Sequence, residues 1–301
     1  PTFVLTAHNT NVVRSICERL AGIPLAIELA AARMRVLTPE QIAVRLDDAF
    51  LLLTGGNRSA LPRHRTLRAT IDWSHALLVP REQKLLRRLS VFAGGFTVEA
   101  AEAVCTDRPH VEAVDAEPLT RDDVLDSLSS LVEKSMVTLE SSGHTLRYRL
   151  LETVRQYATD RLASAGELEA FQAAHAAHFL AFVEAFEPKL LNDEMSGALM
   201  QRLVLEDDNL RVATAWSVGG AVADSDRAAM ALRFAGALFW YWHGSAGWIG
   251  TARYAELRAF VSGALERGSG EAPILRARAL ASAGSIGLAS GTHRGPPPEC
   301  R

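Results

Sequence analysis

Gly22 and Pro24 are the residues of this chain with the clearest potential for chemistry, because they form a Gly-x-Pro turn in front of an Ala- and Leu-rich segment. Proline is favoured in the first turn of a helix, where its missing N–H costs nothing, so the pattern predicts a helix from Pro24 to about Val36. Most helix starts of this kind bind nothing. A binding role for Gly22 and Pro24 therefore depends on what the rest of the chain resembles.

A basic cluster further along the chain could contact the phosphates of a nucleotide or a nucleic acid. Its members are Arg58, Arg63, His64, Arg65 and Arg68. Clustered charges are more often a solvated face, here at a domain junction, and we favour that interpretation.

Two further groups offer binding chemistry. His175 and His178 lie three residues apart on an expected helix, but no third ligand follows at helical spacing, so we predict no metal site. An aromatic group could line a ligand or peptide groove, although packing between helices is the commoner role. This group consists of Phe239, Trp240, Tyr241, Trp242 and Trp248.

The sequence predicts no catalysis by the chain itself. A P-loop places lysine directly after glycine, so that backbone amides hold the phosphates while the ammonium reaches them. The residues before the three lysines of this chain are Gln83, Glu133 and Pro188. The nucleophile elbow of hydrolases and the His-Glu-x-x-His helix of metalloproteases are also missing from the sequence.

Composition indicates a cytoplasmic protein of two or three domains. The 301 residues are 48% hydrophobic and 22% charged, with a net charge of −3 that attracts neither nucleic acid nor an anionic membrane. Cys17, Cys105 and Cys300 are odd in number and widely spaced, which favours a reducing compartment. The longest apolar run, residues 228–242, is shorter than the roughly 20 residues of a spanning helix.

Helical periodicity and turn residues predict a mainly α-helical chain that begins with two domains. Residues 1–57 read as a helical subdomain that ends in the turn-forming Thr54–Asn57. Residues 58–166 read as several helices, two strands (136–140 and 146–150) around a Ser-Ser-Gly turn, and a final helix. This order predicts a winged-helix domain with a small β-hairpin.

The remainder predicts a helical array and an irregular tail. In residues 167–290, helix pairs recur at intervals of about 30–40 residues, which favours a TPR-like α-solenoid. Residues 291–301 contain a proline run instead of the polar capping helix that ends a solenoid. We expect this tail to mark a truncation or frameshift, with the rest of the sensor and a DNA-binding domain missing.

Ordered segments over roughly the first 165 residues resemble the bacterial NB-ARC/STAND regulatory ATPases, which often carry a LuxR-type DNA-binding domain. Several such motifs in order are more specific than any one alone. They are GIPLAIELAAAR (22–33), RHRTLRATIDWS (63–74), LLRRLSVFAGGFTVEAAEAVC (85–105), LVEKSMV (131–137) and YRLLETVRQYA (148–158).

The resemblance implies that residues 1–57 are the C-terminal helical part of a nucleotide-binding domain whose P-loop subdomain lies upstream. Gly22 and Pro24 would then contact ATP or ADP in the intact parent, with Pro24 against the adenine, and this fragment alone would bind nucleotide weakly. Residues 167–290 would form a sensor for a protein or small-molecule effector. DNA would be bound only through a domain absent from this chain, and no membrane partner is implied.

The sequence departs from the family pattern at the Met-His-Asp position, and its recognition helix is unlike one that binds DNA. Where many relatives carry Met-His-Asp, this chain has Leu150-Leu151-Glu152, and Leu151 can neither donate a hydrogen bond nor carry charge. The expected recognition helix, 122–133, is acidic and predicts domain packing rather than DNA binding. We therefore expect a switch and sensor fragment of a STAND-type regulator, or alternatively a helical interaction scaffold that uses no nucleotide.

Overall fold

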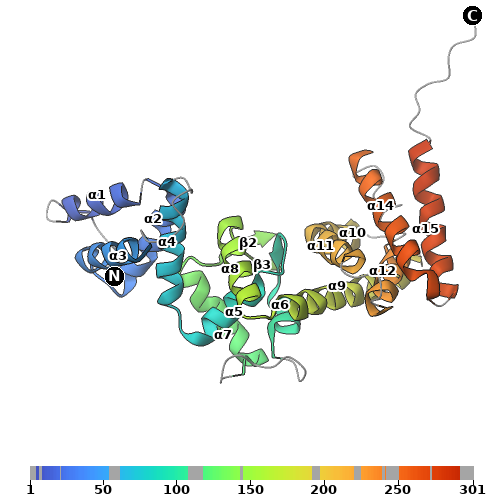
Figure 1. The fold of residues 1–301 in the computed structure, drawn as a ribbon, viewed down its shortest axis with the longest axis horizontal. Helices are drawn as coiled ribbons and strands as arrows, with labels where there is room; N and C mark the ends of the chain where they lie inside the picture. Colours follow the sequence, from blue (N-terminus) through green and yellow to red (C-terminus); the bar gives the residue numbers. More distant parts are fainter. Residues whose placement is uncertain are drawn as a thin grey trace, which may run out of the picture. The chain divides into compact units, whose positions relative to one another are not determined.

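The chain folds mainly into α-helices with one small β-sheet, which confirms the predicted fold class (Figure 1). Its residues group into two compact units, Pro1–Val91 with Gly95–Leu168 and Phe92–Gly94 with Glu169–Arg301. The computed structural model describes residues 5–6, 9–20, 22–53, 62–107, 118–142, 145–191, 197–219, 225–238, 241, 251–271 and 273–291.

The first unit begins with a helical bundle. Its elements are α1 (Thr10–Arg19), α2 (Pro24–Ala32), the 3-10 helix η1 (Arg33–Arg35), α3 (Pro39–Leu53) and α4 (Pro62–Ala76). Thr38-Pro39-Glu40 predicts a helix start with threonine as the cap, and α3 begins there. The Gln41 N–H donates to Thr38 Oγ1 (3.3 Å), and the Thr38 N–H donates to Gln41 Oε1 (3.0 Å). These bonds satisfy amides that lack partners within the helix.

Helix α4 packs against both α2 and α3, and its Trp73 lies in their shared core. It also contacts α8 (Glu152–Ser164), so one helix joins the bundle to the winged helix. The predicted boundary at Thr54–Asn57 lies outside the described residues. Buried residues of the bundle core are Ile16, Leu20, Ala26, Ala30, Ile42, Leu46 and Trp73.

The winged helix follows in the same unit. Besides α8, its elements are α5 (Pro80–Leu89), β1 (Gly95–Phe96), α6 (Val98–Cys105), α7 (Arg121–Glu133), β2 (Thr138–Ser142) and β3 (Thr145–Arg149). The strands form an antiparallel sheet in the order β1-β3-β2, with Leu139 opposite Tyr148 and Phe96 opposite the same tyrosine. The predicted hairpin is therefore present, shifted by two residues in its first strand.

The segment after α5 differs from the sequence-based expectation. Leu85, Leu86, Leu89 and Phe92 share one helical face and predict a helix closed by Gly94-Gly95, but α5 ends at Leu89. Gly94 has a φ of +76°, a conformation that favours glycine, and Gly95 pairs with Arg149 as the first residue of β1. The two residues of β1 are too few to show the alternation that identifies a strand.

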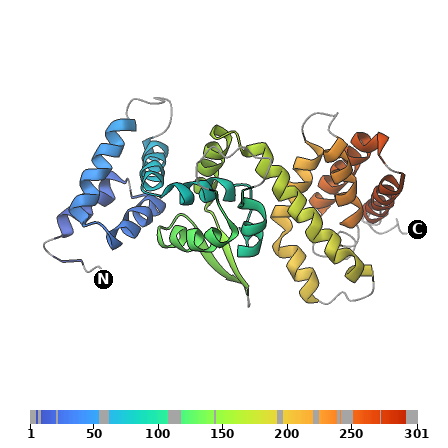
Figure 2. The ribbon, with the colours of Figure 1, turned by 90° about the horizontal axis from the view of Figure 1, so that it is seen from below.

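All the secondary-structure elements described in the second unit are helices. Helix α12 packs against α14 and α15, and α11 packs against α12 and α14; Figure 2 shows the orange and red helices of this group together. None of the described helices is long and apolar enough to cross a membrane. The elements are α9 (Leu168–Leu191), α10 (Gly197–Leu205), α11 (Asp207–Val218), α12 (Ser225–Ala237), α14 (Thr251–Arg267), η2 (Gly268–Gly270) and α15 (Pro273–Gly291).

Candidate functional site

Gly22 and Pro24 form an exposed helix start, as the sequence predicts. Gly22 has a φ of +65°, and a Cβ placed there meets nothing within 4 Å, so the backbone conformation rather than packing favours glycine. Pro24 is the first residue of α2 and follows an extended Ile23. Both positions are therefore accessible to a ligand or to another protein segment.

The other end of the same motif is structural. The Arg33 side chain is 3% exposed, and its Nη2 donates to the Ser74 carbonyl of α4 over 3.0 Å. Burial lowers the pKa of Arg33, and the nearby carboxylate of Glu82 opposes that effect. Arg33 thus attaches the motif to α4 and lies too deep to meet a ligand.

Leu151 stands at the N-cap of α8, where its side chain is 37% exposed, while Leu150 is buried. Glu152 is bound by its own helix, since Arg155 donates to both of its carboxylate oxygens at 2.8 Å and Gln156 donates at 2.9 Å. The Leu150–Glu152 segment therefore presents an apolar side chain where the family pattern has histidine.

The one member of the basic cluster whose side chain is described forms part of the α4–α8 contact. Arg68 pairs with Asp160 at 2.9 Å and lies over the Tyr157 ring, 5.5 Å from its centroid. Arg58 lies outside the described residues, as do the side chains of 63–65. Arg68 is exposed at this junction, which supports the interpretation as a solvated face.

A second ion pair holds the same two helices together. The Tyr157 hydroxyl donates to Asp72 over 2.8 Å, and Arg161 pairs with the same carboxylate at 2.6 Å. Burial and the hydrogen bond to Asp72 raise the pKa of Tyr157. Burial, together with the charge of Arg161, lowers the pKa of His75 to about 4. His75, in the contact between α4 and α8, is therefore neutral at physiological pH.

The recognition-helix position of the winged helix is occupied by α7, and ion pairs fix both of its ends. Asp123 accepts hydrogen bonds from the Thr120 N–H (2.9 Å) and hydroxyl (2.6 Å), and it pairs with Arg81 at 2.8 Å. Glu133 pairs with Arg35 at 3.2 Å. Two acidic residues of α7 are thus engaged with neighbouring elements of their own unit.

Glu82 joins α5 to the end of α7. Its carboxylate accepts hydrogen bonds from the Ser130 hydroxyl (2.6 Å), the Lys134 ammonium (2.5 Å) and the Val79 N–H (3.0 Å). Burial alone would raise the pKa of Glu82, but these hydrogen bonds hold it below its ordinary value. A cation near the recognition helix, Lys134, is therefore used internally.

The exposed face of α7 is acidic and partly apolar. Asp122, Leu125 and Asp126 are exposed, and Leu125 retains 49% of its accessible surface. Side chains that contact DNA phosphates are mainly cationic or hydrogen-bond donors, and ionised aspartate is neither. These three side chains therefore supply no group that attracts a phosphate.

A buried charge network in the winged helix was not predicted. Arg88 is fully buried and pairs with Asp107 (2.6 Å) and Glu167 (2.7 Å), while it also donates to the Cys105 carbonyl (2.9 Å). Arg87 supplies a second contact to Glu167 at 2.6 Å. Partners 79 and 80 residues apart leave no periodic signal in a sequence, although charged residues on the apolar face of α5 were a hint.

His175 belongs to the core of the second unit. It is 1% exposed, contacts the rings of Phe92 and Phe179, and lies 3.3 Å from Asn209 Oδ1. Burial lowers its pKa to about 4. His178 lies against the edge of Phe179, and no group of three potential metal ligands occurs among the described residues.

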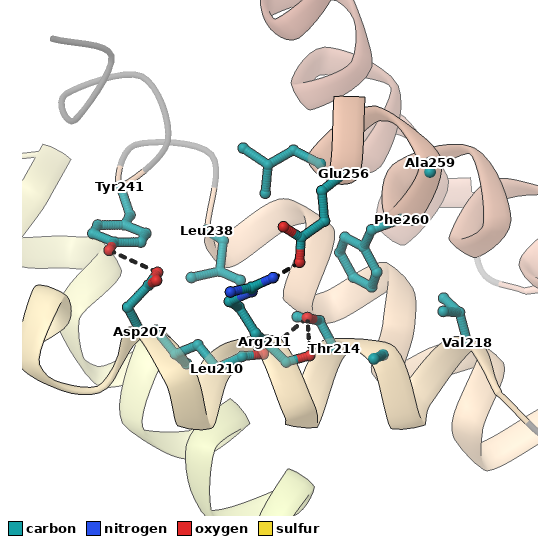
Figure 3. Close-up of a pocket in the computed structure, with 12 residues that line it drawn as sticks. Asp207, Leu210, Arg211, Thr214, Val218, Leu238, Tyr241, Glu256, Ala259 and Phe260 are labelled. Atoms are coloured by element: carbon teal, nitrogen blue, oxygen red, sulfur yellow. Dashed lines mark hydrogen bonds and ion pairs between the residues drawn. The ribbon is translucent and has the colours of Figure 1, made fainter. Parts of the chain in front are cut away.

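A cavity of about 250 Å³ lies between α11 and α14 in the second unit (Figure 3). At one end the Tyr241 hydroxyl donates to Asp207 over 3.1 Å, and the Arg211–Glu256 ion pair (2.9 Å) spans the space between the helices. The rest of the lining is mainly apolar, with Leu210, Val218, Leu238, Leu257 and Phe260.

Tyr241 is the only member of the predicted aromatic group among the described residues, and it lines this cavity. It is also 3% exposed, so it combines the two roles that the sequence left open, groove lining and packing. Phe239, Trp240, Trp242 and Trp248 lie outside the described residues. The charged members of the cavity were not predicted, because helical periodicity does not show which polar residues meet.

Comparison with known proteins identifies the winged helix and a set of relatives. Residues 78–163 match the winged helix-turn-helix domain family. The chain is 44% identical over 246 residues to "Putative HTH-type transcriptional regulator Rv0890c" of Mycobacterium tuberculosis (strain ATCC 25618 / H37Rv), covering 82% of this chain and 26% of that protein. Mb0914c of Mycobacterium bovis (strain ATCC BAA-935 / AF2122/97), which carries the same description, matches equally.

A shorter relative matches part of the chain. "Uncharacterized protein Rv0894" of Mycobacterium tuberculosis (strain ATCC 25618 / H37Rv) is 42% identical over 176 residues, which are 58% of this chain and 43% of that protein. No solved structure matches the chain. The chain spans about a quarter of the length of its HTH-type relatives. It is therefore a homologue of these mycobacterial proteins and contains a winged helix-turn-helix domain.

Proposed function

We propose that this chain is the switch and sensor region of a nucleotide-dependent, STAND-type transcriptional regulator in the cytoplasm. The observation that carries the proposal is the exposed Gly22–Pro24 helix start, which lies in the same compact unit as a winged helix. The similarity to HTH-type transcriptional regulators supports the regulatory part of the proposal. The chain itself performs no catalysis in this scheme.

In the intact protein, bound nucleotide would hold the winged helix against the nucleotide-binding domain. A P-loop subdomain outside this chain would hold the phosphates of ATP or ADP, and Pro24 would pack against the adenine. Leu151 carries no phosphate role, because its side chain has neither a donor nor a charge. Nucleotide exchange would then shift the population between two packings of the winged helix.

The acidic α7 supports the proposal that another domain of the intact protein binds DNA. Asp122 and Asp126 face solvent, while Asp123 and Glu133 are paired with arginines of the same unit. We therefore propose that this winged helix is a packing module in the switch. The helical second unit would receive the effector that sets the switch.

The test is ADP binding to the full-length protein that contains this chain. Replacing Pro24→Ala should weaken ADP binding about tenfold, because the proline ring would lose its contact with the adenine. Pro80→Ala is a matched control, since Pro80 is also exposed and is the first residue of α5 after an extended Val79. Isothermal titration would give both dissociation constants, and the isolated chain should bind ADP weakly.

A second candidate is a helical interaction scaffold that uses no nucleotide. It predicts that the full-length protein does not bind ADP and that Pro24→Ala and Pro80→Ala behave alike. Either result would overturn the STAND-type proposal and leave the cavity between α11 and α14 as the feature to explain.

A further inference from the structure

The outward face of α7 places an exposed leucine between two carboxylates. Asp122, Leu125 and Asp126 follow one another at helical spacing, so they share one face of the helix. All three side chains are exposed, and Leu125 retains 49% of its accessible surface. Single exposed leucines are normal on a protein surface, so a binding role for this face depends on what lies beside it.

A hollow of about 220 Å³ lies beside this face, between α7 and the start of α5. Asp126, which follows Leu125 in α7, lines the hollow from one side, and Val79 and Pro80 line it from the other. Val79 is 54% exposed, and Pro80 is exposed as well. The surface therefore combines exposed apolar groups from two elements around a hollow, which is a feature of protein contact sites.

The charges of this surface leave an acidic excess. The side chains of Asp122 and Asp126 form no hydrogen bond or ion pair within the part of the chain that the structure describes. The other charged groups beside the hollow are paired with one another, Arg81 with Asp123 at 2.8 Å and Lys134 with Glu82 at 2.5 Å. Positive charge on a partner would therefore favour binding to this surface, and negative charge would oppose it.

We propose that this α7 face and the hollow beside it bind a segment of the full-length protein that carries an apolar side chain flanked by lysine or arginine. The apolar group would cover Leu125 and Val79, and the cations would face Asp122 and Asp126. Charges at the rim of such a contact mainly determine its specificity. The chain spans about a quarter of the length of its HTH-type relatives, which leaves room in a protein of that length for a segment that reaches this face.

This inference deepens the proposed function, because it gives the winged helix, as a packing module, a partner of stated chemistry. The role of the contact in a switch rests on that proposed function, whereas the contact itself does not. It can be measured without added nucleotide. Failure to find the contact would therefore leave the ADP result untouched, and failure of ADP binding would leave the contact untouched.

The first experiment measures by mass spectrometry how fast a carbodiimide labels each carboxylate, in this whole chain and in the full-length protein that contains it. A tethered segment reaches an effective concentration of about 1 mM, so a contact with a dissociation constant of about 0.1 mM should slow the labelling of Asp122 and Asp126 about tenfold in the full-length protein. Glu99 is the matched control, because it is an exposed acidic residue in the first turn of α6 and should be labelled equally in both proteins. Equal labelling of Asp122 and Asp126 in the two proteins would overturn the proposal.

Salt and dilution test the chemistry and the source of the partner. Raising the NaCl concentration from about 0.05 M to about 0.5 M should reduce the protection at least about threefold, because salt screens exposed charges. Dilution of the full-length protein by about tenfold should leave the protection unchanged, because the segment belongs to the same molecule. Protection that salt does not change would overturn the basic partner. Protection that is lost on dilution would indicate a second copy, and protection that requires added DNA would indicate a nucleic acid; either result would overturn the proposal.

The second experiment removes the apolar contact. In the full-length protein, Leu125→Ser should restore the labelling of Asp122 and Asp126 to the rate measured in the whole chain that carries the same substitution. Leu139→Ser is the matched control, because Leu139 lies on β2 and is similarly exposed, at 47%. A Leu125→Ser protein that keeps the protection, or equal loss of protection in both variants, would contradict the assigned position of the apolar group.

Discussion

Helices α7 and α11 have similar beginnings and different surroundings. Each carries two acidic residues in its first turn, Asp122 and Asp123 in α7 and Asp207 and Asp208 in α11. In α7, Asp123 binds the backbone and hydroxyl of Thr120 and pairs with an arginine of α5. In α11, Asp207 lines a cavity. The acidic first turn therefore supplies a capping residue in α7 and a residue that lines a cavity in α11.

The difference shows that an acidic helix start does not identify a function by itself. Its effect on the helix is local and similar in both cases, because carboxylates near a helix N-terminus are favourable. Its further role depends on which side chains tertiary structure brings opposite it. For Asp123 the neighbouring element supplies Arg81, whereas for Asp207 it supplies the Tyr241 hydroxyl.

The largest expected effect is the loss of stability when the buried ion pairs of Arg88 are removed. Replacing Arg88→Met should destabilise the first unit by about 3–5 kcal/mol, because two carboxylates would lose a buried partner. Urea unfolding followed by circular dichroism, with hydrogen exchange of α5 and α6 peptides, would measure the loss. Burial favours a raised pKa for Asp107, but its contacts, including that to Arg88, hold the pKa below its ordinary value.

A surface ion pair provides the control for Arg88. Arg149 and Glu140 pair at 3.4 Å, and both side chains are about half exposed. Arg149→Gln should therefore change the free energy of unfolding by less than about 1 kcal/mol. Similar losses for Arg88→Met and Arg149→Gln would contradict a structural role for the buried network.

The second unit should respond to acid through His175. Its pKa of about 4 lies below the unfolded value of about 6.5, so the unfolded state binds the proton more readily. The stability contribution is therefore complete above pH 6.5 and decreases as pH falls toward 4, by about 2 kcal/mol between pH 7 and pH 5. Hydrogen exchange of α9 and α11 peptides, corrected for intrinsic rates, would measure this.

Two glutamine variants separate His175 from other titrating groups. His175→Gln can still form a hydrogen bond with Asn209 and should remove most of the pH dependence in α9 and α11. His178→Gln should retain it, because the His178 side chain is only partly buried. If acid destabilises both variants equally, His175 is not its cause.

Much of the fold could be predicted because its signals are local. Thr97, with Glu99 two residues later, predicts a helix cap, and as the N-cap of α6 it accepts a hydrogen bond from the Ala100 N–H over 3.3 Å. Val124, Leu125, Leu128, Leu131 and Val132 form an apolar stripe that predicts helix α7. Val124, Leu128 and Leu131 are fully buried, whereas Leu125 is 49% exposed. Capping residues and helical spacing act within a few residues, so a sequence displays them directly.

The features that the sequence did not predict depend on contacts between residues far apart in the chain. Strand β1 exists because Gly95 and Phe96 pair with residues of β3 more than 50 positions away. Glu167 meets Arg88 after Gly166 turns the chain with a φ of +71°. The candidate site divides in the same way: Pro24 follows from a local pattern, whereas the α11–α14 cavity requires two helices about 45 residues apart in sequence.

The smallest expected effect is the difference between two matched amide substitutions, one in α7 and one opposite α11. Asp123→Asn in α7 should cost about 1 kcal/mol, because it weakens both the cap at Thr120 and the pair with Arg81. Glu256→Gln opposite α11 should cost a few tenths of a kcal/mol at most, because it removes only an ion pair whose side chains are 48% and 44% exposed. Thermal unfolding of both variants would measure the difference. Equal losses would mean that the ion pair beside α11 contributes as much to stability as the contacts of Asp123 in α7.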